Sequence, residues 1–260
     1  MQLLTSPRNP LLKEVRRAVS RGSLTDQGLC VAEGFHLLEE ALRSDCEVAT
    51  VFAAESVRIT VETRVKGLKQ TRVVELPDDL FQTLATTEAS QGVIALVRPP
   101  AWTLEQLFAG QALLIVLDGV QDPGNAGAML RSAEAFGATG VVLLKGSVNS
   151  YNPKCVRASA GSVFRVPLVA GLDERLLLAA VADREVAMLA LTPGGLMDVA
   201  ACDLKRSSAM IVGSEGRGIR DSLQSRSTGV RIPTVGVESL NAAMAAAIAL
   251  YEARRQRMGA

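Results

Sequence analysis

Short apolar runs separated by helix-like segments dominate the second half of the chain. Residues 112–117 are all apolar, as expected of a strand that is buried on both faces. A helical segment follows at residues 124–136, and a second apolar run follows at residues 140–144. This order predicts a βαβ unit, in which a right-handed crossover joins two parallel strands. Further strands are predicted at residues 166–169, 186–191, 209–212 and 230–232, and a long helix closes the chain.

The first half mixes shorter helices and strands. Residues 9–20 predict a helix, because Pro10 can occupy the first turn and apolar side chains recur on one side. A second helix is predicted at residues 35–44, and strands are predicted at residues 28–32, 49–53, 72–76 and 92–97. The sequence Arg98-Pro99-Pro100 is the clearest break in the pattern. We therefore predict a first α/β domain at residues 1–98, a linker at residues 99–110 and a second α/β domain at residues 111–260.

The composition favours a folded protein without a membrane span. The chain has 260 residues, of which 48% are hydrophobic, and this content argues against disorder. No apolar run reaches the roughly 18 residues that a spanning helix needs. The N-terminal residues also lack the basic and apolar segments of a signal peptide. We therefore expect a soluble, cytoplasmic protein.

Cysteine and histidine offer little chemistry in this chain. Cys30, Cys46, Cys155 and Cys202 are widely spaced and form no C-x-x-C pair, so we expect reduced thiols and no metal site. The single histidine, His36, cannot make a His-rich zinc site, and no nucleophile elbow accompanies it. A functional site would have to rely on other side chains and on the main chain.

Basic residues are concentrated in two stretches, although the formal net charge is only +1. Residues 1–30 hold five basic and two acidic residues, and residues 58–72 hold five basic and one acidic residue. Such patches on a near-neutral protein are typical of an anionic partner bound at selected surfaces. A solvated helix face explains each stretch equally well. Aromatic residues make up 3% of the chain, which disfavours a base-stacking platform.

A turn-rich loop leads from the first apolar run of the second half into a helix. It spans residues 118–125, and Asn125 is well placed as the N-cap of that helix. Arg131 follows six residues later, about 9 Å along a helix with 1.5 Å rise per residue. The loop lacks G-x-G-x-x-G, so a dinucleotide site is not indicated. Spacing alone leaves two interpretations open: a ligand-facing pair, or a cap with a surface ion pair at Arg131.

Two further segments have the character of ligand loops. Gly213-Ser214-Glu215-Gly216-Arg217-Gly218 has three glycines in six residues, which allows close approach to bare main chain. It lacks the Lys-Ser/Thr of a phosphate-binding loop, and a plain turn is the alternative. Ser239-Leu240-Asn241 opens an alanine-rich helix, for which a simple Ser239 cap is the alternative. Because these loops follow predicted parallel strands, as does the loop at residues 192–195, we expect all of them to meet at one edge of the sheet.

Taken together, these motifs resemble the SpoU (TrmH-type) branch of the SPOUT RNA methyltransferases. The resemblance runs through Asn125-Ala126-Gly127-Ala128-Met129-Leu130-Arg131, through the segment at 213–218, and through Ile232-Pro233 to Asn241. The region before Arg98, including Glu33-Gly34 and Gln91-Gly92, is similar to a small ribosomal-protein-like α/β domain that binds RNA substrates in this family. The resemblance implies a C-terminal α/β-knot, a deep trefoil knot in a mostly parallel sheet. It also implies a homodimer with a shared active site.

The resemblance also assigns site residues. It places S-adenosylmethionine near Thr192, Gly213, Ile232 and Leu240. It gives catalytic positions to Asn125, Arg131, Glu215, Ser239 and Asn241. One departure concerns the third motif, where Thr234 replaces the usual Met and the segment before Ser239 is one residue short. This change puts the path of that loop in question.

The reaction that the resemblance implies is methyl transfer to a ribose 2′-hydroxyl of structured RNA. An arginine is effectively always protonated, so our hypothesis is that Arg131 binds a phosphate and stabilises the forming alkoxide. Lys154, Arg157 and Arg165 are candidate RNA contacts near the site. A substrate-binding domain of this type favours 23S ribosomal RNA, with a guanosine as one option, over transfer RNA. A non-catalytic RNA-binding protein on the same fold is the remaining alternative, and neither a membrane nor a metal is expected as a partner.

Overall fold

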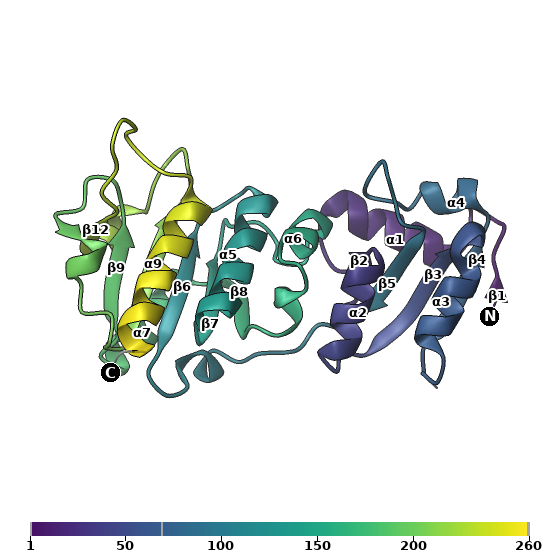
Figure 1. The fold of residues 1–260 in the computed structure, drawn as a ribbon, viewed down its shortest axis with the longest axis horizontal. Helices are drawn as coiled ribbons and strands as arrows, with labels where there is room; N and C mark the ends of the chain where they lie inside the picture. The colour runs from purple at the N-terminus through teal and green to yellow at the C-terminus, as the bar shows by residue number, and fades with distance from the viewer. Residues whose placement is uncertain (1, 69, 259–260) are drawn as a thin grey trace. The chain divides into compact units, whose positions relative to one another are not determined.

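The structure is a computed structural model that describes residues 2–68 and 70–258, so that Lys69, one of the basic residues at 58–72, lies outside the described part. The chain divides into two compact units. The first contains Met1–Pro100 and Tyr151–Arg165, and the second contains Ala101–Ser150 and Val166–Ala260. Figure 1 shows helices and strands of both units.

A five-stranded mixed sheet forms the centre of the first unit, in the order β1-β4-β3-β5-β2. Strand β3 pairs in parallel with β4 and antiparallel with β5. The strands are β1 (Gln2–Leu3), β2 (Cys30–Glu33), β3 (Val48–Ala54), β4 (Arg72–Leu76) and β5 (Val93–Val97). The helices are α1 (Pro10–Arg21), α2 (Phe35–Arg43), the short 3₁₀ turn η1 (Glu55–Val57), α3 (Arg58–Val65) and α4 (Asp78–Gln82).

The predicted first helix is confirmed, and its ends follow from the sequence. Asn9 caps α1, because its side-chain oxygen accepts a hydrogen bond of 3.0 Å from the N–H of Leu11. Pro10 takes the first helical position, where its missing N–H costs nothing. Gly22 ends the helix in the left-handed conformation, with φ of 61°.

A segment that leaves the second unit between β7 and β8 belongs to the first unit by its contacts. It carries α6 (Pro153–Ala158) and η3 (Ser162–Phe164). Arg157 hydrogen-bonds Thr86, and Arg165 pairs with Glu40 at 2.6 Å. Two of the cations expected to contact RNA are therefore held against acceptors within this unit. The continuous ranges predicted from the sequence contain no such excursion, because no composition shift marks it.

The second unit is built on a seven-stranded sheet in the order β10-β12-β9-β11-β6-β7-β8. Every pairing recorded between its described strands is parallel, as predicted. The strands are β6 (Leu113–Asp118), β7 (Gly140–Leu144), β8 (Leu168–Leu172), β9 (Ala187–Leu191), β10 (Met197–Asp198), β11 (Ser208–Gly213) and β12 (Thr228–Arg231). The helices are η2 (Glu105–Phe108), α5 (Pro123–Phe136), α7 (Glu174–Asp183), η4 (Val199–Ala201), α8 (Asp221–Gln224) and α9 (Ala242–Met258).

Part of the predicted linker packs into the core of the second unit. Leu107 of η2 is fully buried, in a cluster with residues of β6 and β7. A Cβ atom at Gly140 would lie 2.3 Å from Cγ of Leu107, so only glycine lets η2 approach the start of β7 this closely.

Helices α5 and α9 lie side by side in parallel (Figure 1). Their first turns are joined by a hydrogen bond of 3.0 Å between Asn241 and Asn125. Further along, the Phe136 and Tyr251 rings meet edge to face at 5.7 Å. The buried side of α9 is mainly alanine, which permits close packing, whereas Met244, Ile248 and Tyr251 remain exposed.

An ion pair between Arg220 and the buried Asp118 fastens the loop after β11 to the end of β6. Asp118 is only 3% exposed. It accepts hydrogen bonds from the main-chain N–H of Arg220 at 2.9 Å and from its Nε at 2.7 Å. The same guanidinium donates to Glu174 of α7 at 3.0 Å. These hydrogen bonds, led by the one to Asp118, raise the pKa of Arg220 above its usual value.

We expect Arg220→Met to destabilise the second unit by about 3 kcal/mol, because it leaves the buried Asp118 carboxylate without its cationic partner. Asp118→Asn combined with Arg220→Met should recover part of the loss, since the buried charge is then gone. Urea unfolding followed by the fluorescence of Trp102, the single tryptophan, reports on this unit. If the single and double variants were equally unstable, the buried charge would not be the cause.

Candidate functional site

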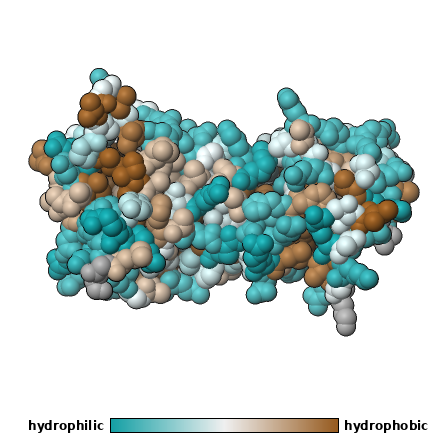
Figure 2. All heavy atoms as spheres, in the orientation of Figure 1, coloured by the Kyte–Doolittle hydropathy of each residue, from teal (hydrophilic) through white to brown (hydrophobic). Residues whose placement is uncertain are grey.

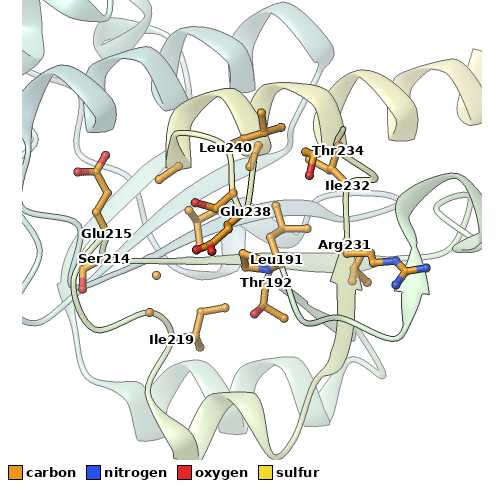
Figure 3. Close-up of a pocket in the computed structure, with 18 of the residues that line it drawn as sticks. Leu191, Thr192, Ser214, Glu215, Ile219, Arg231, Ile232, Thr234, Glu238 and Leu240 are labelled. Atoms are coloured by element: carbon orange, nitrogen blue, oxygen red, sulfur yellow. The ribbon is translucent and has the colours of Figure 1, made fainter. Parts of the chain in front are cut away.

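A cavity of about 610 Å³ lies where the loops after β9, β11 and β12 meet (Figure 3). The expectation that these loops converge is confirmed, because parallel strands bring their carboxyl ends to one edge of the sheet. The four residues predicted to contact a cofactor all line this cavity: Thr192, Gly213, Ile232 and Leu240. Leu191, Ile232 and Leu240 supply apolar side chains, so the cavity combines an apolar lining with exposed main chain.

The loop after β11 turns back tightly on itself. Ser214 and Gly218 exchange main-chain hydrogen bonds of 3.2 and 2.8 Å. A Cβ atom at Gly213 would lie 2.1 Å from the carbonyl carbon of Gly218, so no other residue fits there. Gly218 has φ of 69°, a left-handed conformation that favours glycine. Much of the cavity wall is consequently bare main chain, with N–H and C=O groups close to any ligand.

Three side chains from distant parts of the chain form a polar cluster beside this loop. Asn125 donates from Nδ2 to Oε1 of Glu215 at 2.8 Å. Asn241 donates from Nδ2 to the same Oε1 at 3.2 Å and to Oδ1 of Asn125 at 3.0 Å. Two amides therefore fix the orientation of one carboxylate, and no hydrogen bond is recorded for its second oxygen among the described residues. We call Asn125, Glu215 and Asn241 the amide–carboxylate cluster.

The two helix caps next to this cluster differ from the sequence prediction. Asp122 caps α5, accepting a hydrogen bond of 2.7 Å from the N–H of Asn125, so the prediction of an Asn125 cap is wrong. The helix begins earlier because Pro123 is preorganised for its first turn. The Asn125 side chain is thereby free to reach Glu215.

The start of α9 is capped by Asn241 and not by Ser239. Oδ1 of Asn241 accepts hydrogen bonds from the N–H groups of Ala243 and Met244, at 2.9 and 3.3 Å. A single amide therefore serves two purposes, because its oxygen caps the helix while its nitrogen joins the cluster. Ser239 lines the cavity with Glu215.

Arg131 stands apart from the other predicted site residues. It is exposed on α5, and the structure records no hydrogen bond or ion pair for it within the described residues. It does not line the cavity, and it is not part of the amide–carboxylate cluster. The structure of one chain thus assembles Asn125, Glu215, Ser239 and Asn241, and leaves Arg131 on the surface.

Not every residue of the cavity was predicted from the sequence. Glu238 points its carboxylate into the cavity (Figure 3), and no partner is recorded for it in the part of the chain that the structure describes. Its position directly before Ser239 was the available signal. Arg231 also borders the cavity, but its guanidinium turns away to Asp198, with Nε to Oδ1 at 2.6 Å.

The loop between Pro233 and Ser239, whose path the sequence left in question, folds into an exposed tip. Oγ1 of Thr234 donates to the carbonyl oxygen of Val237 at 2.9 Å. Gly236 turns the chain with φ of 81°. Val235 at the tip is fully exposed.

Histidine, cysteine and metal-binding groups contribute little in the described part of the chain. His36 is exposed on α2 of the first unit. All four cysteines are free, and burial raises the pKa of the Cys30 thiol, which keeps it unreactive. Among the described residues, no group of three or more His, Cys, Asp or Glu side chains could hold a metal ion. None of the described helices is both long and apolar enough to cross a membrane.

Two family profiles match the chain. Residues 112–251 match the SpoU rRNA Methylase family, and residues 9–95 match the MRM3-like substrate binding domain. The first match covers the whole edge of the sheet that carries the cavity, together with the three motifs.

Individual relatives match over nearly their full length. The 23S rRNA (guanosine(2553)-2'-O)-methyltransferase RlmP of Bacillus subtilis is 31% identical over 98% of this chain and 100% of the relative. The 23S rRNA (guanosine-2'-O-)-methyltransferase RlmB of Ralstonia nicotianae is 32% identical over 86% of this chain and 94% of the relative. A solved structure of the SpoU methyltransferase AviRb from Streptomyces viridochromogenes, in complex with AdoMet, superposes with a TM-score of 0.88. It is 28% identical and covers 96% of this chain and 99% of that chain.

We expect Asn241→Ser to keep most of the stability of α9, and Asn241→Ala to lose about 1 kcal/mol. Serine retains a side-chain oxygen that can cap the helix, and alanine does not. Thermal unfolding of the two variants beside the unchanged protein measures the difference. If the serine variant lost as much as the alanine variant, the bonds to Asn125 and Glu215, not the cap, would hold the helix start.

Proposed function

The chain belongs to the SpoU rRNA methylase family, and we propose that it transfers a methyl group from S-adenosylmethionine to a ribose 2′-hydroxyl of ribosomal RNA. The family matches confirm the predicted resemblance and fold class. The observation that carries the proposal is a main-chain cavity bordered by the amide–carboxylate cluster. This pairs a place for an activated donor with polar groups that can hold a hydroxyl.

The residues of the cavity suit the donor. Its volume of about 610 Å³ is typical of a small-molecule site. Leu191, Ile232 and Leu240 offer apolar contact for an adenine ring, and the bare main chain after β11 offers hydrogen bonds. Bound there, S-adenosylmethionine supplies a methyl group already activated by a positive sulfur. The similar AviRb protein was solved in complex with the same cofactor.

The protein's own contribution is alignment of the acceptor. Fixing the attacking group in place can supply up to roughly 7–11 kcal/mol of a barrier. The amide–carboxylate cluster is suited to this role, since Glu215 is held by two amides and keeps one oxygen for a ligand. The transferred carbon bonds to the 2′-oxygen as its bond to sulfur breaks, the bonding electrons stay on sulfur, and the hydroxyl proton passes to water. No histidine is needed for these steps.

Arg131 fits this scheme through a second copy of the chain. A guanidinium stays charged, so it suits binding of a phosphate and stabilisation of a forming alkoxide. In one chain Arg131 lies exposed on α5, beside α9. The exposed side chains of Met244, Ile248 and Tyr251 recur along one face of α9, and Figure 2 shows apolar residues over this helix. A homodimer formed through α5 and α9 would cover this face and bring Arg131 to the partner's cavity.

The first unit is proposed to bind the RNA substrate, in line with its match to the MRM3-like substrate binding domain. Its basic stretches form exposed pairs, such as Arg17 with Asp26 at 2.7 Å and Arg64 with Glu39 at 3.0 Å. Such pairs contribute little to stability, so phosphates can compete for these cations. The relatives named for 23S rRNA guanosines favour that acceptor over transfer RNA. An acceptor in ribosomal RNA also fits the expectation of a cytoplasmic protein.

We expect ribosomal RNA from cells that lack the gene to lose one 2′-O-methyl group, which the purified protein restores with S-adenosylmethionine. Glu215→Gln should lower this activity at least a hundredfold, because it removes the charge that the two amides orient. Mapping of 2′-O-methyl sites in 23S rRNA and in transfer RNA identifies the acceptor. An unchanged methylation map would refute the assignment, and a missing group in transfer RNA would move it to the alternative substrate.

We expect a mixture of Arg131→Ala and Asn125→Ala proteins to regain activity that neither has alone. If Arg131 acts in the partner's cavity, a hybrid dimer contains one site with both residues intact. Random exchange of subunits should then restore about a quarter of the activity of the unchanged protein. Refolding the two variants together, with each refolded alone as the control, measures the recovery. An inactive mixture that sedimentation shows to be dimeric would place Arg131 in the site of its own chain.

A further inference from the structure

A second cavity adjoins the cavity proposed to bind S-adenosylmethionine, which we call the donor cavity. Both lie within the second unit. The second cavity has a volume of about 710 Å³ and is bordered by the loop after β6, the start of α5 and the loop after β7. Both cavities are lined by Gly213, Ser214, Glu215, Arg217 and Gly218. The tight turn after β11 is thus a partition between two spaces. Asn125 lines only the second cavity, and Glu215 lines both.

The geometry of methyl transfer calls for two adjacent spaces of this kind. The attacking oxygen must approach the methyl carbon from the side opposite the sulfur, so donor and acceptor lie on opposite sides of that carbon. A turn that carries Glu215 and borders a cavity on each side is consistent with this requirement. The 2′-hydroxyl is then expected beside the amide–carboxylate cluster, with the rest of its nucleotide in the second cavity.

The lining of the second cavity has the chemistry of a nucleotide site. Gly119, Gly146 and Gly216 border it, and a Cβ atom at any of them would meet no heavy atom within 4 Å. Bare main chain is therefore open to a ligand at these three positions. Gln121 adds an exposed amide that can both donate and accept hydrogen bonds.

Three cationic side chains border this cavity, and they differ in how firmly each is held by acidic partners. Arg220 is committed to Asp118 and Glu174, so it serves the fold. Lys145 makes an exposed pair with Asp173 at 3.0 Å, which is weak enough to exchange for a phosphate. The exposed Arg217 has no recorded side-chain hydrogen bond or ion pair to any described residue, and it stands at the partition. Its guanidinium is free to bind an oxyanion in a forked geometry.

We propose that the second cavity binds the acceptor nucleotide of the RNA, with Arg217, assisted by Lys145, on an adjacent phosphate. The inference rests on the proposed function and names the acceptor side of the same site. It assigns Arg217 and Gly216 to substrate binding, where Arg217 supplies charge and Gly216 supplies room.

The role of the Arg217 charge is tested by the salt dependence of RNA binding, measured without S-adenosylmethionine. Each phosphate contact contributes about 0.9 to the slope of log affinity against log salt for a duplex, and somewhat less for single strands. Arg217→Ala should weaken binding of in vitro transcribed 23S rRNA about tenfold and reduce the slope by about one. The control is Arg226→Ala, which removes another exposed arginine, one that lies outside both cavities. A slope and affinity equal to those of the unchanged protein would overturn the proposal.

The need for space at Gly216 is tested by replacing this glycine with larger residues. Gly216 is not in a left-handed conformation and has open space around it. The series Gly216→Ala, Gly216→Val and Gly216→Leu should raise KM for RNA stepwise. The Kd for S-adenosylhomocysteine should stay constant, because Gly216 does not line the donor cavity. A rise in that Kd with constant KM would assign the residue to the donor and overturn the proposal. If the largest variant failed to fold, the alanine variant and the salt slope of Arg217→Ala would still decide.

A failure of the acceptor-cavity proposal can be distinguished from a failure of the proposed function. A protein that binds no donor and methylates no RNA refutes the function. A protein that methylates RNA while Arg217→Ala and Gly216→Leu behave like the unchanged chain refutes only the acceptor cavity.

Discussion

The site depends on a buried charge at the end of a central strand. Asp118 is the last residue of β6, and its carboxylate is buried, so it needs a partner. Arg220 supplies that partner through both its main chain and its side chain. Because Arg220 follows the turn after β11, this contact fixes where the turn stands on the edge of the sheet. Glu215 lies within that turn, so its distance to Asn125 and Asn241 follows from an ion pair that itself takes no part in chemistry.

Regular structure was largely readable from the sequence. The apolar runs gave the strands of the parallel sheet, and Asn9 with Pro10 gave the start of α1, because these signals act within a few residues. The excursion of Tyr151–Arg165 into the first unit was not readable. It depends on contacts such as Arg165 with Glu40, which lie far apart in the sequence. The knot was expected only from the family resemblance, because no local pattern encodes the order in which a chain is threaded.

The hydrogen bonds of the candidate site could not be predicted from the sequence. Sequence motifs named Asn125, Glu215 and Asn241, and the structure joins them by hydrogen bonds. The cap at Asp122 was missed because Asp and Asn are equally good caps, and the choice depends on which residue Pro123 allows to enter the helix. Glu238 was missed because a carboxylate becomes meaningful only once the cavity in front of it is known.

Asn241 both caps α9 and holds Glu215, so the geometry of the site depends on the first turn of that helix. Terminal turns open at a much smaller free-energy cost than a whole domain. When the first turn of α9 frays, the same event removes an amide from Glu215 and releases the contact to Asn125. Warming should therefore erode turnover well before the global melting transition, with the protein still compact and the loss reversed on cooling.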